Sequence, residues 1–284
     1  MPSAARDPAH RTDNLRSGTP ADTVLVVPCF NEEDRLPVAV LREGLEQDPH
    51  LGLVLVDDGS TDATLGRLAE VRRGFEARVH VESLPHNAGK GAAVRHGILR
   101  ALGGGPRFVG YWDADLATPL PVLADLVAVL RARPACHAVL GSRVRLLGRR
   151  IERRALRHYL GRVWATAASV VLRMPVYDTQ CGAKLFRAGG PLAAALEAPF
   201  ASRWAFDVEL LARLRATTGC QDVDECFVEH PLVAWRDVAG SKLTAGAALR
   251  SGLDLARIAW RVRRGARPAV SPVADRPPAP TAPR

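Results

Sequence analysis

Hydrophobic and polar positions follow two alternating rhythms along the first half of the chain. Short runs rich in β-branched residues, typical of buried strands, separate segments whose apolar residues recur every three or four positions, typical of helices. The predicted strands are Thr23–Val27, Leu51–Val56, Arg78–Ser83, Arg107–Trp112 and His137–Leu140. The predicted helices are Leu36–Leu45, Ala63–Arg73, Ala92–Leu102 and Pro121–Arg131. This alternation predicts an α/β fold with a doubly wound, mostly parallel sheet flanked by helices.

The pattern changes after Arg143. A long basic stretch leads into a loop, a helix, an extended segment and a last amphipathic helix. These elements are Glu152–Arg173, the loop that follows it, Phe206–Ala216, Glu225–Trp235 and Ala245–Arg263. We therefore expect a disordered leader over 1–22, one folded domain over 23–243, a basic amphipathic helix over 244–266 and a disordered Pro-rich tail over 267–284.

Charge and apolar content limit the setting of the protein. Its net charge of +9 predicts an acidic partner, which leaves nucleic acid, anionic lipid or a phosphorylated substrate open. The leader lacks the apolar core of a secretory signal, and the longest uncharged apolar run in a helical segment, Val163–Leu172, is about half of a membrane span. We expect a cytoplasmic protein without a spanning helix. The five cysteines form no C-x-x-C pair and are expected to be reduced and mostly buried.

Polar clusters follow three of the predicted strands. They are Pro28–Glu33, Asp57–Ser60 and Asp113–Asp115. Each cluster alone also fits an ordinary turn or helix cap. Ligands of open α/β sheets bind beyond the carboxyl ends of the strands, however, and carboxylates gathered there repel one another unless a cation or a bound group compensates them. The three clusters together predict a ligand site at this edge.

Asp113-Ala114-Asp115 has the chemistry of a metal and diphosphate site. Two carboxylates after a strand can bind Mg²⁺ or Mn²⁺, whose remaining positions go to diphosphate oxygens and water. The segment His86–Gly91 opens the third helix, where glycines and amides can approach a phosphate. It matches neither the dinucleotide-binding G-x-G-x-x-G pattern nor the P-loop, so both of those functions lose support.

The second half offers basic and polar candidates with two interpretations each. Arg143 and the arginines beyond it, including Arg154, form either a solvated face or a set of guanidinium groups that hold phosphates and lipid headgroups. The helix in this stretch and the last helix either pack on the core or lie in a membrane interface. Asp207 and Glu209 can belong to a polar site, or they can simply cap their helix and face solvent.

Short blocks along the chain resemble family 2 glycosyltransferases with the GT-A fold. The blocks are VVPCFNEE, LVDDGSTD, NAGKGAAVRHG, DADLAT, GSR, DTQCGAKLF, RWAFDVELL and GSKL. They are most similar to dolichyl-phosphate glucose synthases and their prokaryotic polyprenyl-phosphate relatives. The resemblance covers Val24 to Leu243, which makes 23–243 a GT-A catalytic domain. DTQCGAKLF and RWAFDVELL are far more specific than the Asp-x-Asp triplet.

The resemblance implies a role for individual positions. The nucleotide would be bound by Pro28, Asn31, Glu32, Asp57, Asp58, Lys90 and Asp113. Asp113 and Asp115 would hold the metal, and Arg143 would meet a phosphate. The sugar and acceptor pocket would be shaped by Asp178, Gln180, Trp204, Asp207 and Lys242, with Arg154 from the basic stretch. Mannose-transferring relatives commonly carry Gln where this chain has Ala117, which favours glucose.

The implied reaction is an inverting transfer of a hexose, glucose favoured, from a UDP-sugar to a polyprenyl or dolichyl phosphate, with Mg²⁺ or Mn²⁺ as cofactor. A phosphate monoester is already anionic near neutral pH and attacks without a general base. The enzyme would then lie at the inner, cytoplasmic membrane face, through its surface helices or a membrane partner protein.

Two other functions remain open. The same fold can transfer the sugar to a hydroxyl acceptor, which needs a general base, and Asp178 or Asp207 would be the candidates. A non-catalytic basic protein that binds membrane or nucleic acid is the third possibility. Asp113 and Asp115 argue against it, and no nucleic-acid partner is expected.

Overall fold

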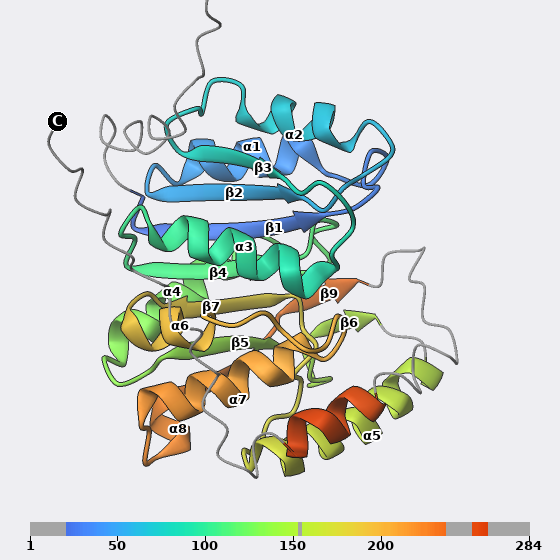
Figure 1. Cartoon of the computed structure of the whole chain (residues 1–284), viewed down its shortest axis with the longest axis vertical. Helices are drawn as coiled ribbons and strands as arrows, with labels where there is room; N and C mark the ends of the chain where they lie inside the picture. Colours follow the sequence, from blue (N-terminus) through green and yellow to red (C-terminus); the bar gives the residue numbers. More distant parts are fainter. Residues whose placement is uncertain (1–20, 153–154, 237–251, 261–284) are drawn as a thin grey trace, which may run out of the picture.

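The chain forms a seven-stranded sheet with helices on both faces (Figure 1). The computed structural model describes residues 21–152, 155–236 and 252–260, with the backbone alone at 152 and 155–160. The strands lie in the order β3-β2-β1-β4-β7-β5-β8. Their bounds are β1 Thr23–Cys29, β2 Leu51–Asp57, β3 Val79–Ser83, β4 Phe108–Trp112, β5 Ala138–Ser142, β7 Ala183–Arg187 and β8 Phe227–Pro231. A separate ribbon pairs β6 (Arg150–Glu152) with β9 (Ala234–Arg236).

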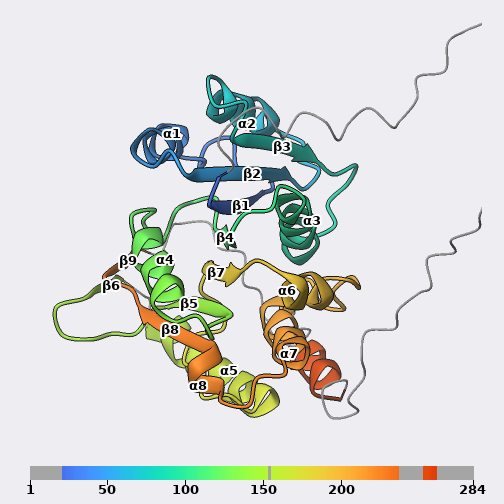
Figure 2. The same ribbon diagram turned by 90° about the vertical axis from the view of Figure 1, so that its left-hand side faces the viewer.

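The helices cover the two faces in separate groups (Figure 2). Their bounds are α1 Val38–Gln47, α2 Thr64–Arg72, α3 Lys90–Leu102, α4 Val122–Ala132, α5 Ala155–Leu172, α6 Gly190–Ala195, α7 Phe206–Thr218 and α8 Val223–Cys226. One core cluster joins α1, α2 and α4 to the sheet, and the other joins α3, α5, α6, α7 and the helical segment 252–260. The predicted α/β fold with a mostly parallel sheet is therefore confirmed.

Alternation of side chains in β1 explains the two cores. Leu25 and Val27 belong to the cluster under α1, α2 and α4, whereas Val26 between them belongs to the other cluster. In a strand covered on both faces, neighbouring side chains point to opposite layers, so the strand is apolar throughout. β2 is buried along its whole length for the same reason. Parallel pairing of Cys29 with Asp57 brings the polar ends of these two strands side by side.

β7 is a central strand that the sequence pattern does not predict. Its residues were expected to belong to the loop after the basic helix, but they form a central strand that is antiparallel to both β4 and β5. The register places Lys184 opposite Tyr111, and Ala183 opposite Trp112. A charged residue within a five-residue strand conceals the apolar pattern, although Lys184 itself is fully buried. Because Ala183 pairs with Trp112, the start of the DTQCGAKLF block lies beside the end of β4.

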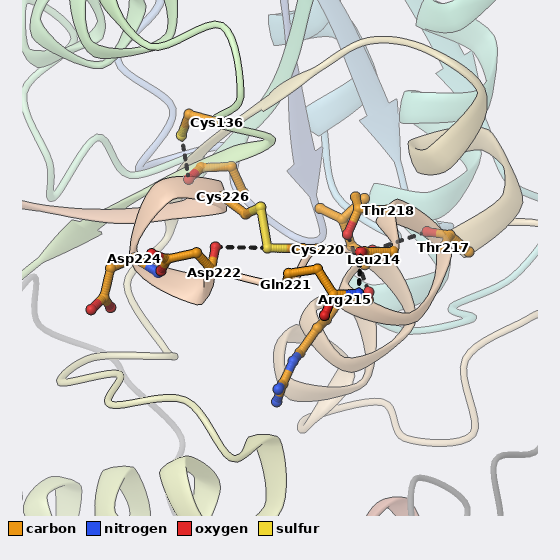
Figure 3. The surroundings of a disulfide bond; sticks show 12 residues. Cys136, Leu214, Arg215, Thr217, Thr218, Cys220, Gln221, Asp222, Asp224 and Cys226 are labelled. Carbon is orange, nitrogen blue, oxygen red and sulfur yellow. Dashed lines mark hydrogen bonds between the residues drawn. A yellow bond between two sulfur atoms is a disulfide. The ribbon is translucent and has the colours of Figure 1, made fainter.

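A disulfide corrects the prediction for the cysteines. Cys29, Cys136 and Cys181 are free and buried, as expected, but Cys220 and Cys226 are bonded to each other (Figure 3). α7 ends at Gly219 in the left-handed conformation, and the chain turns back there toward α8. The turn brings together two cysteines whose spacing does not match a recognised motif. The disulfide ties the end of α7 to the start of β8.

Some predicted segments lie outside the described residues. These are 1–20 of the leader, the tail beyond 266, and the 244–266 helix except for 252–260, which is helical. The described part of the leader is tied to the sheet, because the Asp22 carbonyl accepts from the amides of Arg107 and Phe108. Within the described ranges, no helix combines the length and the apolar character needed to cross a bilayer.

The close approach of α3 to the sheet gives a test of the fold. A Cβ on Gly97 would overlap Val26 Cγ1 and lie 3.0 Å from Val56 Cγ2, whereas a Cβ on Gly66 in α2 would meet nothing within 4 Å. We expect Gly97→Ala to lower the free energy of unfolding by about 1–3 kcal/mol, because overpacking strains the core. The matched Gly66→Ala should raise it by about 0.5–1 kcal/mol through helix propensity. Urea denaturation of both variants measures this, and equal stability would show that α3 does not pack so closely.

Candidate active site

The site begins where β4 ends, at Asp113. Lys90, the first residue of α3, forms an ion pair with the Asp113 carboxylate. The carbonyl oxygen of Gly182, just before β7, accepts a hydrogen bond from the Asp113 amide at 3.0 Å. A Cβ on Gly182 would overlap the Asp113 carboxylate. Only glycine therefore fits against this side chain. β4, α3 and β7 together determine the position of one carboxylate.

Charge compensation keeps Asp113 ionised. Burial alone would raise the pKa of Asp113, but the Lys90 ammonium outweighs burial and the pKa is lowered. For Lys90, burial acts to lower the pKa, and the carboxylates of Asp113 and Asp207 reverse this and raise it. The pair thus carries both charges across the neutral pH range.

Asp115 and Glu32 add further carboxylates to the same place. Burial, followed by the Asp113 carboxylate, raises the pKa of Asp115. Burial also raises the pKa of Glu32; Arg35, which contacts it at 2.5 Å, opposes the shift, and Asp115 adds to it. The predicted convergence of the β1 and β4 clusters is thus seen in the electrostatics. Residues Asn31 and Leu116 beside these groups have positive φ, 53° and 46°, which is uncommon away from glycine.

This arrangement fits a divalent cation that is shared with a ligand. The buried Glu32 Oε2 has no hydrogen-bond partner among the described residues, and burial together with neighbouring carboxylates raises the pKa values of Glu32 and Asp115. Nowhere in the described ranges do three His, Cys, Asp or Glu side chains form a complete ligand set. A cation at Asp113 and Asp115 would therefore take its other ligands from a bound diphosphate and water. Oxygen ligands of this kind suit Mg²⁺ or Mn²⁺.

The remaining predicted nucleotide residues line the adjoining edge and stabilise its loops. Asp57 accepts from the Ser60 amide at 3.0 Å, and Asn31 Oδ1 accepts from the Thr61 amide at 2.9 Å. Asp58 is buried and accepts from the amides of Ala88 and Gly89, both at 2.8 Å.

Pro28 follows in the same register, opposite Val56. The structure therefore brings the β1 and β2 clusters together, with Asp58 facing the loop before α3.

Arg143 and Asp178 form a second charged pair in the site. Arg143 Nε and Nη2 donate to the two Asp178 oxygens at 2.6 and 2.8 Å, and the Arg143 amide adds a third bond at 3.1 Å. The guanidinium lies over Trp235 at 5.1 Å. Burial acts to lower the pKa of Arg143, but Asp178 raises it, with Asp113 contributing. Arg143 therefore stays charged, and its charge interacts with that of Asp113.

Asp207 belongs to a buried network behind Asp113. It accepts from Lys184 Nζ at 2.8 Å, from the Tyr111 hydroxyl, and from Gln180 Nε2 at 3.5 Å. Burial raises the pKa of Asp207 to about 7 and lowers that of Lys184 to about 7. Lys184 also donates to the Cys181 carbonyl at 2.6 Å. The network joins α7 to β4 and β7 underneath the site.

Trp204 lies apart from the buried network, and two further predicted residues fall outside the described ranges. Trp204 stands in the turn before α7 and is 52% exposed. Its neighbour Arg203 instead reaches across to the loop before α3, where it donates to the Asn87 carbonyl at 3.1 Å. Arg154 and Lys242 lie outside the described residues.

The sequence patterns did not assign several residues that build the site. Tyr111, Gly182, Lys184 and Trp235 all contact predicted site residues. Lys184 and Gly182 stand in the DTQCGAKLF block, so a lysine inside an apolar run was the available signal. Tyr111 and Trp235 look like ordinary core and strand residues, and only the fold gives them polar neighbours.

Comparison with known proteins finds matches to one family of enzymes. The family model "Glycosyl transferase family 2" matches residues 24–189. The dolichyl-phosphate beta-glucosyltransferase of Drosophila melanogaster is 32% identical over 280 residues, covering 88% of this chain and 80% of that protein. The human protein of the same name is 32% identical over 268 residues, covering 85% and 76%.

Solved structures show the same fold at low sequence identity. Mycobacterium tuberculosis glucosyl-3-phosphoglycerate synthase with Mn²⁺ and UDP-glucose has a TM-score of 0.61 at 20% identity, covering 84% of this chain and 79% of that one. Its complex with UDP has a TM-score of 0.58 at 21% identity, with coverage of 84% and 80%. The expected GT-A fold is confirmed. On the family match and the relatives together, the chain belongs to glycosyl transferase family 2.

Proposed function

We propose that the protein transfers glucose from UDP-glucose to a polyprenyl or dolichyl phosphate, with inversion at the anomeric carbon. The observation that carries this proposal is the pairing of a carboxylate cluster at Asp113 with the charged Arg143 beside it. The first suits a cation and a diphosphate, and the second suits a further phosphate. The names of the relatives, dolichyl-phosphate beta-glucosyltransferases, support the acceptor, and the UDP-glucose in a structural neighbour supports the donor.

The chain's own residues would position two phosphate groups. Asp113 and Asp115 would hold Mg²⁺ or Mn²⁺, which would neutralise the leaving diphosphate when bound. Lys90 adds a positive charge at the same carboxylate. Arg143 would orient the acceptor phosphate through its guanidinium, which Asp178 holds at Nε and Nη2. Catalysis would rest on positioning and charge balance rather than on proton transfer.

The positions of Asp178 and Asp207 favour a phosphate acceptor over a hydroxyl. A general base must reach the acceptor proton with a free oxygen. Asp178 is bound by Arg143 through both oxygens, and Asp207 is held by Lys184 and Tyr111 in the buried network. Neither carboxylate is placed to accept a proton from a hydroxyl group, whereas an anionic phosphate needs none.

A transfer assay tests the proposed function. Purified protein with UDP-[¹⁴C]glucose, Mn²⁺ and polyprenyl phosphate should produce a labelled lipid, and a chelator should stop the reaction. Asp115→Asn should lower the rate about a hundredfold or more, because the cation loses a charged ligand. Asp125→Asn, on the half-exposed side chain in α4, is the control and should keep full activity. Label that appears only in a water-soluble glycoside would refute the lipid acceptor, and near-normal turnover by Asp115→Asn would refute the metal assignment.

We further propose that an anionic bilayer is the surface on which the enzyme meets its acceptor. α5 exposes Val163, Thr166, Ala167 and Val170 at helical spacing without a charge, with Val163 and Val170 about 70% and 68% exposed. The helical segment 252–260 exposes Leu253 and Trp260 in the same manner, next to the exposed Arg257. Both pack on one core cluster, and the views place them at the same end of the molecule (Figures 1 and 2). Apolar stripes bordered by arginine fit a headgroup interface.

Vesicle sedimentation tests this surface. We expect the protein to sediment with phosphatidylserine-containing vesicles at low salt, and less so at high salt. Val163→Glu/Val170→Glu should lower the bound fraction, because two charges would enter the interface. Leu65→Glu, at an exposed apolar position of α2, should bind like wild type. Equal binding by all three proteins would exclude α5 from the contact, and absence of wild-type binding would refute the docking proposal.

A further inference from the structure

Glu229 on β8 holds the segment that carries Asp178. Its two carboxylate oxygens accept from consecutive backbone amides, Oε2 from Tyr177 at 2.7 Å and Oε1 from Asp178 at 2.8 Å. β8 is an edge strand of the sheet, and Glu229 is paired in register with Leu140 of β5. β5 itself leads into Ser142 and Arg143. Glu229 thus fixes the position of the segment at Asp178 relative to β5, the strand that leads into Arg143.

Packing against this segment is incomplete on the β8 side. A cavity of about 190 Å³ lies there, lined among others by Met174, Pro175, Val176, Phe227 and Glu229. The opposite side is held from α5, where Arg162 donates to the Tyr177 carbonyl at 3.0 Å and Ser169 to the Val176 carbonyl at 2.6 Å. A cavity supplies few contacts to resist a shift, so the two bonds of Glu229 carry the restraint on that side.

The consequence reaches Arg143 through Asp178. Asp178 accepts from Nε, Nη2 and the amide of Arg143, and a bidentate pair of this kind fixes the plane of the guanidinium. A displaced Asp178 would therefore change the orientation of the Arg143 guanidinium. The nucleotide edge is built from β1, β2 and α3, whereas Glu229 accepts its hydrogen bonds from the backbone at Tyr177 and Asp178.

We propose that Glu229 is a positioning residue for the transfer reaction, acting through Asp178 to aim Arg143 at the acceptor phosphate. The proposal rests on the proposed function. In the proposed reaction Glu229 contacts neither the UDP-glucose nor the acceptor. Its effect on the transfer rate depends on the length of its side chain as well as on its charge. Donor binding and acceptor alignment should therefore respond differently to its replacement.

Steady-state kinetics of the full-length protein separate these effects. Glu229→Gln turns an amide donor toward a backbone N–H, and Glu229→Asp keeps the charge but is too short to reach both amides. Both variants should lower kcat about 10- to 100-fold and leave the KM for UDP-glucose within about threefold of wild type. Glu225→Gln, at an exposed carboxylate of α8, should leave both constants unchanged. Melting temperatures measured beside the assay show that each variant is folded.

A double-mutant cycle separates positioning from general destabilisation. Glu229→Gln should lower activity much less in an Arg143→Lys background than in wild type, because the two changes remove one alignment. Additive losses in the cycle would overturn the proposal, as would a normal kcat in Glu229→Gln. Full activity in Glu229→Asp would also overturn it, because charge alone would then explain the effect of Glu229. Wild-type protein that labels no lipid would instead refute the proposed function and, with it, this role.

Discussion

The ion pair between Lys90 and Asp113 is the interaction on which the arrangement of the site depends. Burial raises the pKa values of Glu32 and Asp115, and repulsion from neighbouring carboxylates adds to both shifts. Lys90 offsets this repulsion through its ion pair with Asp113. Because Lys90 starts α3 and Asp113 directly follows β4, the pair also sets how the helix meets the sheet. The uncompensated charge that remains is what suits a cation.

Antiparallel β7 explains how the second half of the chain serves the same centre. By entering between β4 and β5, it brings Gly182 against Asp113 and sends the Lys184 ammonium to Asp207 beneath. A buried pair of this kind is costly to desolvate, and it is tolerated here because Tyr111 and the Cys181 carbonyl complete the hydrogen bonds. Residues of the DTQCGAKLF and RWAFDVELL blocks therefore support Asp113 from the protein interior.

The sequence predicted the first half of the fold well, and in the second half it predicted the helix from Phe206 but missed β7 and the disulfide, for physical reasons. Strands such as β2 are apolar throughout and end in acidic turns, so both their position and their polar edge can be recognised. β7 contains a buried lysine, and the Cys220–Cys226 pair depends on a left-handed turn at Gly219, so neither follows from periodicity.

The candidate site divides in the same way. Glu32, Asp113 and Asp115 were predicted to converge because parallel strands share an edge, and their electrostatics agree. The partners of Asp178 and Asp207 come from distant segments, so the sequence showed that these carboxylates are unusual but not that they bind Arg143 and Lys184. Glu229 gave no signal at all, since a glutamate on an edge strand is ordinary.

The central claim is that one carboxylate cluster binds a cation and a nucleotide diphosphate together. Calorimetric titration of UDP with and without Mn²⁺ tests it most directly, because no acceptor or turnover is involved. We expect Mn²⁺ to tighten UDP binding about tenfold or more in the wild-type protein, and to lose this effect in Asp115→Asn. Equal UDP affinity in Mn²⁺ and in chelator would contradict the account.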